Sequence, residues 1–304
     1  MKKKLTLLIT IILLWVNISA MPSASRNREV VISEKTATLF LDETLELELE
    51  NAPKNKTIIW QSSDEEIAAV SGNGKIKPEK CGKVMITAKL DKKKYICRVK
   101  VIKKNASDVK ALKCLIKEQQ KAGADVAKDI NSFDYVWNEN GRLTEIHWYL
   151  SELKGNLSFC SLPALEYICV GENNLTGLDV SRNENLQELE CFDNKLKDLN
   201  LAGNPELKEL SCDYNSLTRL DISRNRKLKA VTCVGNKLTC LHIGQNLKLK
   251  YLQCSKNQLT GLDVSKNTLL NGLWCKNNNI KKLNLKSNKK LDSLKCDKKV
   301  KVIR

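Results

Sequence analysis

The sequence is poor in the residues that build most catalytic sites. Its 304 residues include two histidines, His147 and His242, and only 5% aromatic residues. Neither histidine stands beside a nucleophile or acid motif, and the chain has no HExxH, no GxSxG and no phosphate-binding glycine loop. Asp179, Asp221 and Asp263 recur at a regular interval, but they are too far apart along the chain to suggest a catalytic pair. We therefore predict that the protein is not an enzyme and holds neither a cofactor nor a metal ion.

Long hydrophobic runs are missing beyond the N-terminus. Three lysines precede an apolar run of about 12 residues, Leu5 to Val16, and small residues follow it. This pattern is typical of a secretory signal peptide over residues 1–24, cleaved after Ala20 or Ala24, because the run is too short to cross a bilayer comfortably. An uncleaved membrane anchor is the alternative. No later stretch resembles a membrane span, so we expect no transmembrane segment in the mature chain.

Signals for covalent attachment are absent as well. No lipobox cysteine follows the apolar run, and the final residues, KCDKKVKVIR, contain neither a hydrophobic tail nor a sorting motif. We therefore expect any attachment to a cell surface to be non-covalent.

Residues 28–103 show the alternation of half-buried β-strands. TLELELE (44–50) alternates leucine with glutamate, and KYICRVKV (94–101) places Cys97 in its apolar row. Several short strands separated by turns within one such stretch predict a β-sandwich.

The segment WQSSDEEIAAVSGNGKI, followed by a strand that begins at Gly82 and by YICRVKVI, resembles the bacterial Ig-like domain of group 2, found in surface proteins related to invasin and intimin. The resemblance covers about residues 30–103. It implies a spacer module in which Trp60 is a core residue. Cys81 and Cys97 either form a disulfide or leave Cys97 as a buried free thiol, and its place in the apolar row favours the free thiol.

Residues 104–142 are predicted to form a linker and a helical N-terminal cap. In DVKALKCLIKEQQKAG the apolar residues recur at helical spacing, Ser107 or Asp108 is placed to cap the start, and Gly123 to end the helix. One amphipathic helix cannot bury its apolar stripe alone. We therefore expect it to cover the open edge of the repeats that follow.

The strongest pattern is a 21-residue repeat within residues 143–304. From Leu165 onward each unit follows L-x-x-L-x-C-x-x-N-x-L-x-x-L-x-[LIV]-x-x-N-x-x, and the irregular segment GRLTEIHWYLSELKGNLSFCSLPA precedes it as a capping repeat. The pattern resembles the leucine-rich repeat family, in its short bacterial type called IRREKO, and the whole resembles internalin-like adhesins, whose repeats contact host proteins. The chain is thus predicted to be an all-β Ig-like sandwich, a capping α-helix and a β-rich leucine-rich-repeat solenoid.

One cysteine recurs in each unit, at Cys191, Cys212, Cys233, Cys254, Cys275 and Cys296. These thiols are expected to point inward and to stack at the strand separation of about 4.8 Å. Disulfides prefer Cβ atoms about 3.8 Å apart, and metal sites need converging ligands rather than a row. Val170 also replaces the first thiol, so packing is favoured over disulfides and metal binding. Cys169 and Cys240 are expected to face outward, either paired with a partner or kept reduced.

The two repeated asparagines have a structural interpretation too. Each is expected to turn the chain out of a strand and to satisfy backbone groups of its own and the adjacent coils.

Function is then expected on the exposed positions between the inward leucines, because these positions stack into one extended face. Aromatic side chains exposed beside charges are typical binding anchors. The candidate partner-binding residues are Tyr167, Phe192, Tyr251, Trp274 and Lys276. The alternative is that the rings only pack on neighbouring coils.

Charge differs between the two ends of the repeat region. Residues 165–227 contain 8 Lys and Arg against 12 Asp and Glu, a net of −4, whereas residues 228–304 contain 17 against 3, a net of +14. A basic stretch of this size attracts anionic partners, but no nucleic-acid motif is present. We expect an exported recognition protein, secreted or non-covalently attached to the bacterial surface, that binds a protein or glycan and no nucleic acid. The alternative is a structural wall protein held by anionic cell-wall polymer.

Overall fold

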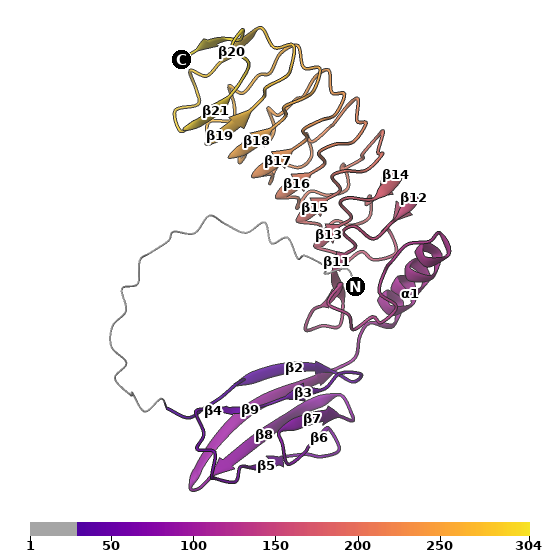
Figure 1. Cartoon of the computed structure of the whole chain (residues 1–304), viewed down its shortest axis with the longest axis vertical. Helices are drawn as coiled ribbons and strands as arrows, with labels where there is room; N and C mark the ends of the chain where they lie inside the picture. Colours follow the sequence, from indigo (N-terminus) through magenta and orange to yellow (C-terminus); the bar gives the residue numbers. More distant parts are fainter. Residues whose placement is uncertain (1–28) are drawn as a thin grey trace.

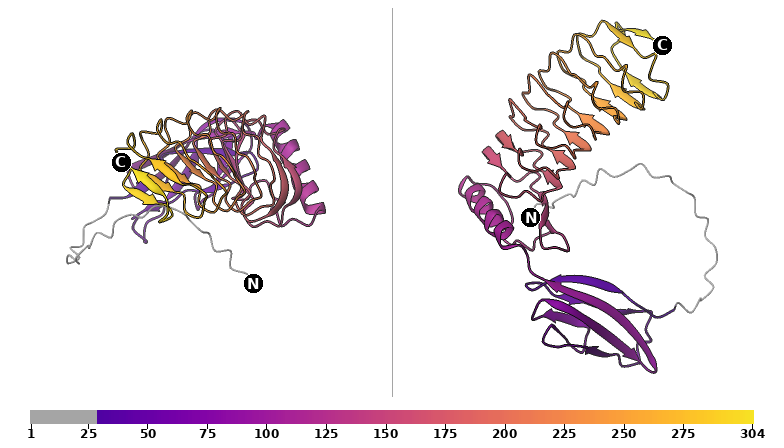
Figure 2. Two further views of the ribbon diagram at one scale, coloured as in Figure 1. Left: turned by 90° about the horizontal axis from the view of Figure 1, so that it is seen from above. Right: turned by 180° about the vertical axis from the view of Figure 1, so that it is seen from behind.

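The computed structural model describes residues 29–304, which form a β-sandwich, a helix and a solenoid in chain order (Figure 1). The predicted signal peptide lies outside the described residues. Figure 2 shows the same arrangement from behind, with the helix at the junction between sandwich and solenoid. Among residues 29–304, no helix is long and apolar enough to cross a membrane.

Nine short strands of the described chain build the sandwich. They are β1 (Val31–Ile32), β2 (Thr36–Phe40), β3 (Leu45–Glu46), β4 (Leu49–Glu50), β5 (Ile59–Ser62), β6 (Ala68–Val70), β7 (Lys75–Pro78), β8 (Gly82–Leu90) and β9 (Lys93–Ile102). Their order is β2-β9-β8-β5 in one sheet and β3-β7-β6 in another, with β1 and β4 as a separate pair. Leu47 and Leu49 are buried, and Glu48 between them is exposed, as are Glu46 and Glu50 on either side, which confirms the predicted alternation.

Trp60 packs against the sandwich core beside the turn that holds Gly74. Gly74 has a φ of +88°, and a Cβ there would lie 2.3 Å from the Leu47 carbonyl oxygen and 2.9 Å from the Trp60 ring, so only glycine fits. Cys97 is buried and free while Cys81 is exposed, which confirms the predicted buried thiol. Burial raises the pKa of the Cys97 thiol to about 11.

Lys104 links the sandwich to the rest of the chain. Its side chain is 5% exposed, and its ammonium nitrogen lies 2.9 Å from Asp42 Oδ1 and 3.1 Å from Glu43 Oε1 in the sandwich. It also donates to Asn131 Oδ1 at 2.6 Å, in the segment after the helix, and lies 4.1 Å from the centre of the Phe40 ring. One cation therefore binds acceptors from both sides of the junction.

The helix α1 (Ala106–Lys121) covers the first coil of the solenoid (Figure 1). Leu112, Leu115 and Ile116 are buried in the same hydrophobic core as the coils, which confirms the predicted cap. An edge that would otherwise expose a hydrophobic cross-section is thereby closed.

The N-cap of α1 differs from the prediction. It is Asn105, whose side chain accepts the backbone N–H groups of Ser107 at 3.1 Å and Asp108 at 3.2 Å. The prediction of Ser107 or Asp108 as the cap is wrong because the Asp108 carboxylate is instead bound to Arg142.

The solenoid consists of short strands, nine of them in one sheet and the others in two smaller sheets. They are β10 (Tyr135–Trp137), β11 (Leu143–His147), β12 (Lys154–Ser158), β13 (Tyr167–Cys169), β14 (Asn174–Asp179), β15 (Glu188–Glu190), β16 (Glu209–Ser211), β17 (Ala230–Thr232), β18 (Tyr251–Gln253), β19 (Gly272–Trp274), β20 (Lys282–Asn284), β21 (Ser293–Lys295) and β22 (Lys301–Ile303). A nine-stranded sheet runs β10-β11-β13-β15-β16-β17-β18-β19-β21, parallel from β11 onward, and the pairs β12-β14 and β20-β22 form the two smaller sheets. Register advances by one unit per strand, so that Leu189 pairs with Leu210 and Leu210 with Val231.

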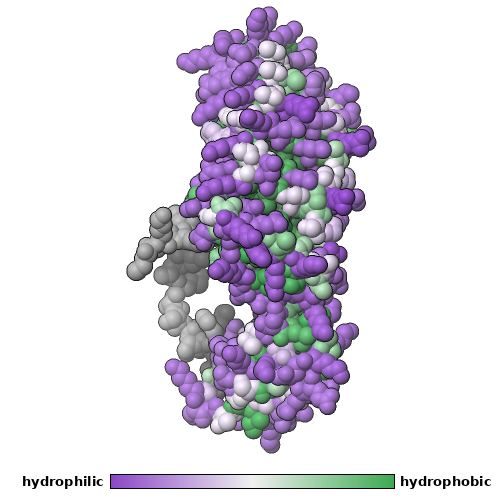
Figure 3. All heavy atoms as spheres, turned by 90° about the vertical axis from the view of Figure 1, so that its right-hand side faces the viewer, coloured by the Kyte–Doolittle hydropathy of each residue, from purple (hydrophilic) through white to green (hydrophobic). Residues whose placement is uncertain are grey.

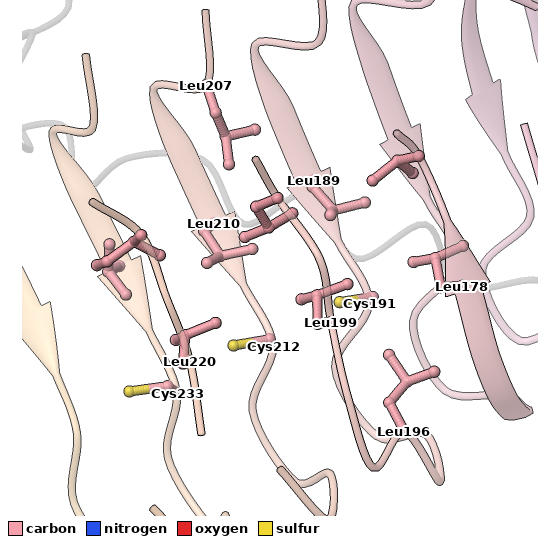
Figure 4. Packing of buried hydrophobic residues seen from close by; sticks show 14 of the residues in the cluster. Leu178, Leu189, Cys191, Leu196, Leu199, Leu207, Leu210, Cys212, Leu220 and Cys233 are labelled. Atoms are coloured by element: carbon pink, nitrogen blue, oxygen red, sulfur yellow. The ribbon is translucent and has the colours of Figure 1, made fainter. Parts of the chain in front are cut away.

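The repeated cysteines form a buried column beside the repeated leucines, as Figure 4 shows for Cys191, Cys212 and Cys233. All but the last of the six are at most 1% exposed, and Cys296 is partly buried. All twelve cysteines are free. The column therefore packs as small apolar side chains, as predicted.

Burial also predicts how these thiols react. It raises the pKa of Cys275 to about 12 and that of Cys254 well above its usual value, so the column holds no thiolate at neutral pH. We expect iodoacetamide to label Cys81, Cys114 and Cys240, which are exposed, and to label the column only after unfolding in guanidinium. Peptide mass spectrometry of freshly reduced protein measures both states. Equal labelling of column and exposed cysteines in the native state would contradict this packing.

The two asparagines of each unit form two buried ladders. In the first, represented by Asn236, the amide donates to carbonyl groups of its own and the preceding coil and accepts the N–H of Leu217 at 3.0 Å. In the second, represented by Asn225, it donates to the carbonyl oxygens of Leu201 and Asn204 in the preceding coil. Both ladders confirm the predicted structural role.

Candidate binding surface

The outward side chains of the nine-stranded sheet form one continuous surface, the sheet face. Its members on strands β11 to β21 are Glu145, His147, Tyr167, Cys169, Glu188, Glu190, Glu209, Ser211, Ala230, Thr232, Tyr251, Gln253, Gly272, Trp274, Ser293 and Lys295. Parallel pairing brings equivalent positions of successive coils side by side. Every predicted binding residue lies on this face or directly after one of its strands.

The first half of the sheet face is acidic. Glu188 is paired with Glu209 on the next strand and lies near Glu145 and Glu190. Burial, followed by repulsion from these neighbouring carboxylates, raises the pKa of Glu188. This half of the face would therefore repel an anionic partner.

Tyr167 is half-buried in the acidic half. Its ring lies 4.9 Å from the ring of His147, centre to centre. Cys169, predicted to be exposed, is only 6% exposed, and its Sγ lies 3.5 Å from Glu190 Oε2. That prediction is wrong because neighbouring side chains on the sheet face cover the thiol, and burial raises its pKa to about 12.

Phe192 packs on its neighbours. Its ring lies over Gly171, where a Cβ would come within 2.7 Å of it, and its centre is 6.0 Å from that of the Tyr149 ring. Tyr214, which the sequence did not single out, is 45% exposed, with the Lys256 ammonium 5.3 Å from its ring centre. Tyr214 lies in the turn after β16 at a φ of +50°, one position beyond the repeat positions expected to form the binding face.

The second half of the sheet face combines accessible aromatic rings with lysines. Tyr251 is 45% exposed, and Trp274 lies over Gly272, where a Cβ would be 2.7 Å from the indole and 3.0 Å from the Tyr251 ring. Because Gly272 has no side chain, the Trp274 and Tyr251 rings can both pack closely against strand β19. The Lys295 ammonium lies 5.7 Å from the centre of the Trp274 ring.

The lysines around these rings are exposed. With the two rings, Lys256, Lys276 and Lys295 form what we call the aromatic–lysine patch. The nearest carboxylate after β21, that of Asp297, accepts the backbone N–H of Asn277 at 3.0 Å. The patch can therefore offer an apolar platform and a net positive charge to a ligand.

In the part of the chain that the structure describes, no three His, Cys, Asp or Glu side chains are grouped so that they could hold a metal ion. The repeated aspartates act locally instead. Asp179, Asp221 and Asp263 each accept the backbone N–H of the serine two residues later, which shapes a turn.

Comparisons with known proteins agree with the sandwich assignment. The family model of the bacterial Ig-like domain (group 2) matches residues 28–99. No curated protein matches the chain.

Three solved structures are similar to part of the chain. The functional domain of InlJ from Listeria monocytogenes, which includes a cysteine ladder, is 30% identical over 52% of this chain and 40% of that chain, with a TM-score of 0.45. A leucine-rich-repeat protein of Leptospira interrogans is 25% identical over 45% and 38%, with a TM-score of 0.42. An internalin from Listeria monocytogenes is 19% identical over 48% and 61%, with a TM-score of 0.36. The chain thus spans less than half the length of the first two. The protein carries an N-terminal bacterial Ig-like domain of group 2, followed by a leucine-rich β-solenoid with structural matches to Listeria internalins.

Proposed function

We propose that the protein is an exported, non-enzymatic recognition protein of adhesin type, secreted or held non-covalently at the bacterial surface. The Ig-like domain acts as a spacer, and the sheet face binds a protein or glycan partner. The observation that carries this proposal is the aromatic–lysine patch, where the exposed Tyr251 and the half-buried Trp274 lie beside exposed lysines.

We expect the predicted binding residues to contribute unequally. Tyr167 and Phe192 already pack against rings of preceding coils, so they are expected to shape the face rather than anchor a ligand. Tyr251, Trp274 and Lys276 are expected to make the main contacts, because accessible aromatic residues and cations dominate binding energies at interfaces. The favoured partner is anionic at this end of the face.

A wall-associated structural role is the second candidate. It is supported by the exposed lysines of the last two coils, including Lys281, Lys282, Lys289, Lys290 and Lys299. Such a protein would be held to anionic wall polymer by charge alone.

Binding experiments with Trp274→Ala and Tyr251→Ala separate the two candidates. Each substitution should weaken binding to immobilised sialylated or sulfated glycoproteins by about 2 kcal/mol, roughly 30-fold. Phe133→Ala is the matched control, since Phe133 is 81% exposed and lies outside the sheet face. Retention on purified wall sacculi at low salt, release at about 0.5 M salt and insensitivity to Trp274→Ala would instead establish the wall role.

A further inference from the structure

A groove lies on the solenoid at the turns that precede strands β16, β17 and β18. Its cavity of about 670 Å³ is lined by Ala202, Pro205, Ser223, Arg224, Arg226 and Gln245. A second cavity of about 330 Å³ shares Ala202 and Arg224 with it. Figure 3 shows one flank of the molecule, where hydrophilic side chains dominate the solenoid surface. We call the larger cavity the arginine groove.

The groove exists because one coil lacks a long side chain. Most coils carry a long polar side chain at the eighteenth position of the repeat, as in Arg182, Arg224, Gln245 and Lys266. Coil 186–206 has Gly203 there, where a Cβ would lie 2.1 Å from the Ser181 carbonyl oxygen. Its neighbours Ala202 and Pro205 are also short, so the space beside Arg224 stays open.

The two arginines of the groove are free to bind a ligand. Both are exposed, and neither guanidinium makes a hydrogen bond or ion pair with another residue of the described chain. By contrast, the neighbouring Arg219 lies 3.3 Å from Asp198 Oδ1.

Two carboxylates, those of Asp198 and Asp221, line the second cavity beside the groove. Asp221 accepts the backbone N–H of Ser223 at 2.9 Å. That bond, together with the Ser223 hydroxyl and a smaller effect of the Arg224 charge, lowers the pKa of Asp221. No acidic side chain lines the arginine groove itself.

We propose that the arginine groove binds a sugar that bears an oxyanion, as a carboxylate or as a sulfate or phosphate ester. Guanidinium groups match the planar or tetrahedral geometry of such anions with paired hydrogen bonds. The Gln245 amide offers hydrogen-bond partners to sugar hydroxyls, while Ala202 and Pro205 provide an apolar floor. The volume falls in the range of small-molecule sites. This site is independent of the aromatic–lysine patch.

Titration of the mature chain by NMR chemical-shift perturbation tests the proposal. Glucuronate, glucose 6-sulfate and glucose 6-phosphate are the probes, with glucose as the neutral control and inorganic sulfate and phosphate as free anions. At least one anionic sugar should bind in the millimolar range or better, more tightly than glucose and than the free anions. The perturbed amides should belong to residues around Arg224 and Arg226. No binding of any anionic sugar at about 10 mM would overturn the proposal.

Variants locate the site. Arg224→Ala and Arg226→Ala should each weaken binding at least about 10-fold, because each removes one charge-assisted donor group. Arg182→Ala is the matched control at the same repeat position two coils earlier, and it should change nothing. Ala202→Tyr should block the groove without removing a charge. Equal effects of Arg182→Ala and Arg224→Ala would overturn the proposal as unspecific charge attraction. Trp274→Ala should leave this binding intact, so failure here and failure of the sheet face remain distinguishable.

Discussion

Replacing Asn236 by alanine is expected to lower the free energy of unfolding of the solenoid by about 2–4 kcal/mol. The Asn236 amide donates to the carbonyl oxygens of Cys212 at 2.9 Å, Cys233 at 3.3 Å and Val234 at 3.4 Å. Its Oδ1 accepts the buried N–H of Leu217 at 3.0 Å. Alanine would leave the buried Leu217 N–H without a partner. The three carbonyl oxygens would each lose one donor but keep another, from Asn215, Asn257 and the Tyr214 backbone N–H.

The second ladder should be less sensitive. Asn225 donates to two carbonyl oxygens, those of Leu201 at 2.9 Å and Asn204 at 2.8 Å, and its Oδ1 has no partner among the described protein atoms. Asn225→Ala therefore leaves fewer buried backbone groups without a hydrogen-bond partner than Asn236→Ala does. We expect its cost to be smaller by about 1–2 kcal/mol.

Guanidinium unfolding followed by circular dichroism compares the two variants. Lys237→Ala is the control, because Lys237 is exposed and adjacent to Asn236, and it should change stability by less than about 0.5 kcal/mol. Solenoids can unfold in parts, so the curves are to be fitted with nearest-neighbour coupling rather than with two states. An Asn225→Ala variant as unstable as Asn236→Ala would contradict the difference between the ladders.

The repeat predicted the solenoid core well because each unit repeats one local environment. An inward position in one coil is inward in every coil, so the cysteine column and both asparagine ladders follow from the 21-residue period alone. Val170, at the place of the first cysteine, is likewise fully buried.

The sheet face could not be predicted in the same way, because its details depend on contacts between unlike side chains of adjacent coils. Cys169 is buried although it points outward, since neighbours on the same face cover it. The aromatic rings pack where a glycine leaves room for them: Phe192 lies over Gly171, and Trp274 lies over Gly272. The sequence shows these residues but not which ring covers which glycine.

The same limit applies at the junction before the repeats. Helical spacing correctly placed the apolar stripe of α1, but the cap could not be chosen among neighbouring polar residues. Asp108 was a good candidate by local rules. Its actual partner, Arg142, is 34 residues away and is found only in three dimensions.

The second large effect is expected from loss of the contact between Asp108 and Arg142. The Asp108 carboxylate is 1% exposed and binds Arg142 Nε at 2.7 Å, Arg142 Nη2 at 3.1 Å and the Leu143 backbone N–H at 3.1 Å. It thereby fastens α1 to β11, the first strand of the parallel stack. Asp108→Ala should destabilise the cap by about 2–4 kcal/mol, at the lower part of the range for broken buried pairs because Arg142 is 33% exposed.

Loss of this contact should open the end of the solenoid. With α1 loosened, Leu112, Leu115 and Ile116 and the core of the first coil would meet water, so the dye ANS should bind Asp108→Ala and not the wild type. Asp125→Ala, at an exposed aspartate just beyond the helix, is the control and should bind no dye. Asp108→Asn should fall between them, since an amide can still accept the Leu143 N–H but carries no charge for Arg142. If Asp108→Ala melts like the wild type and stays dye-free, the helix is held by its apolar stripe alone, and the ion pair contributes little to closing the solenoid.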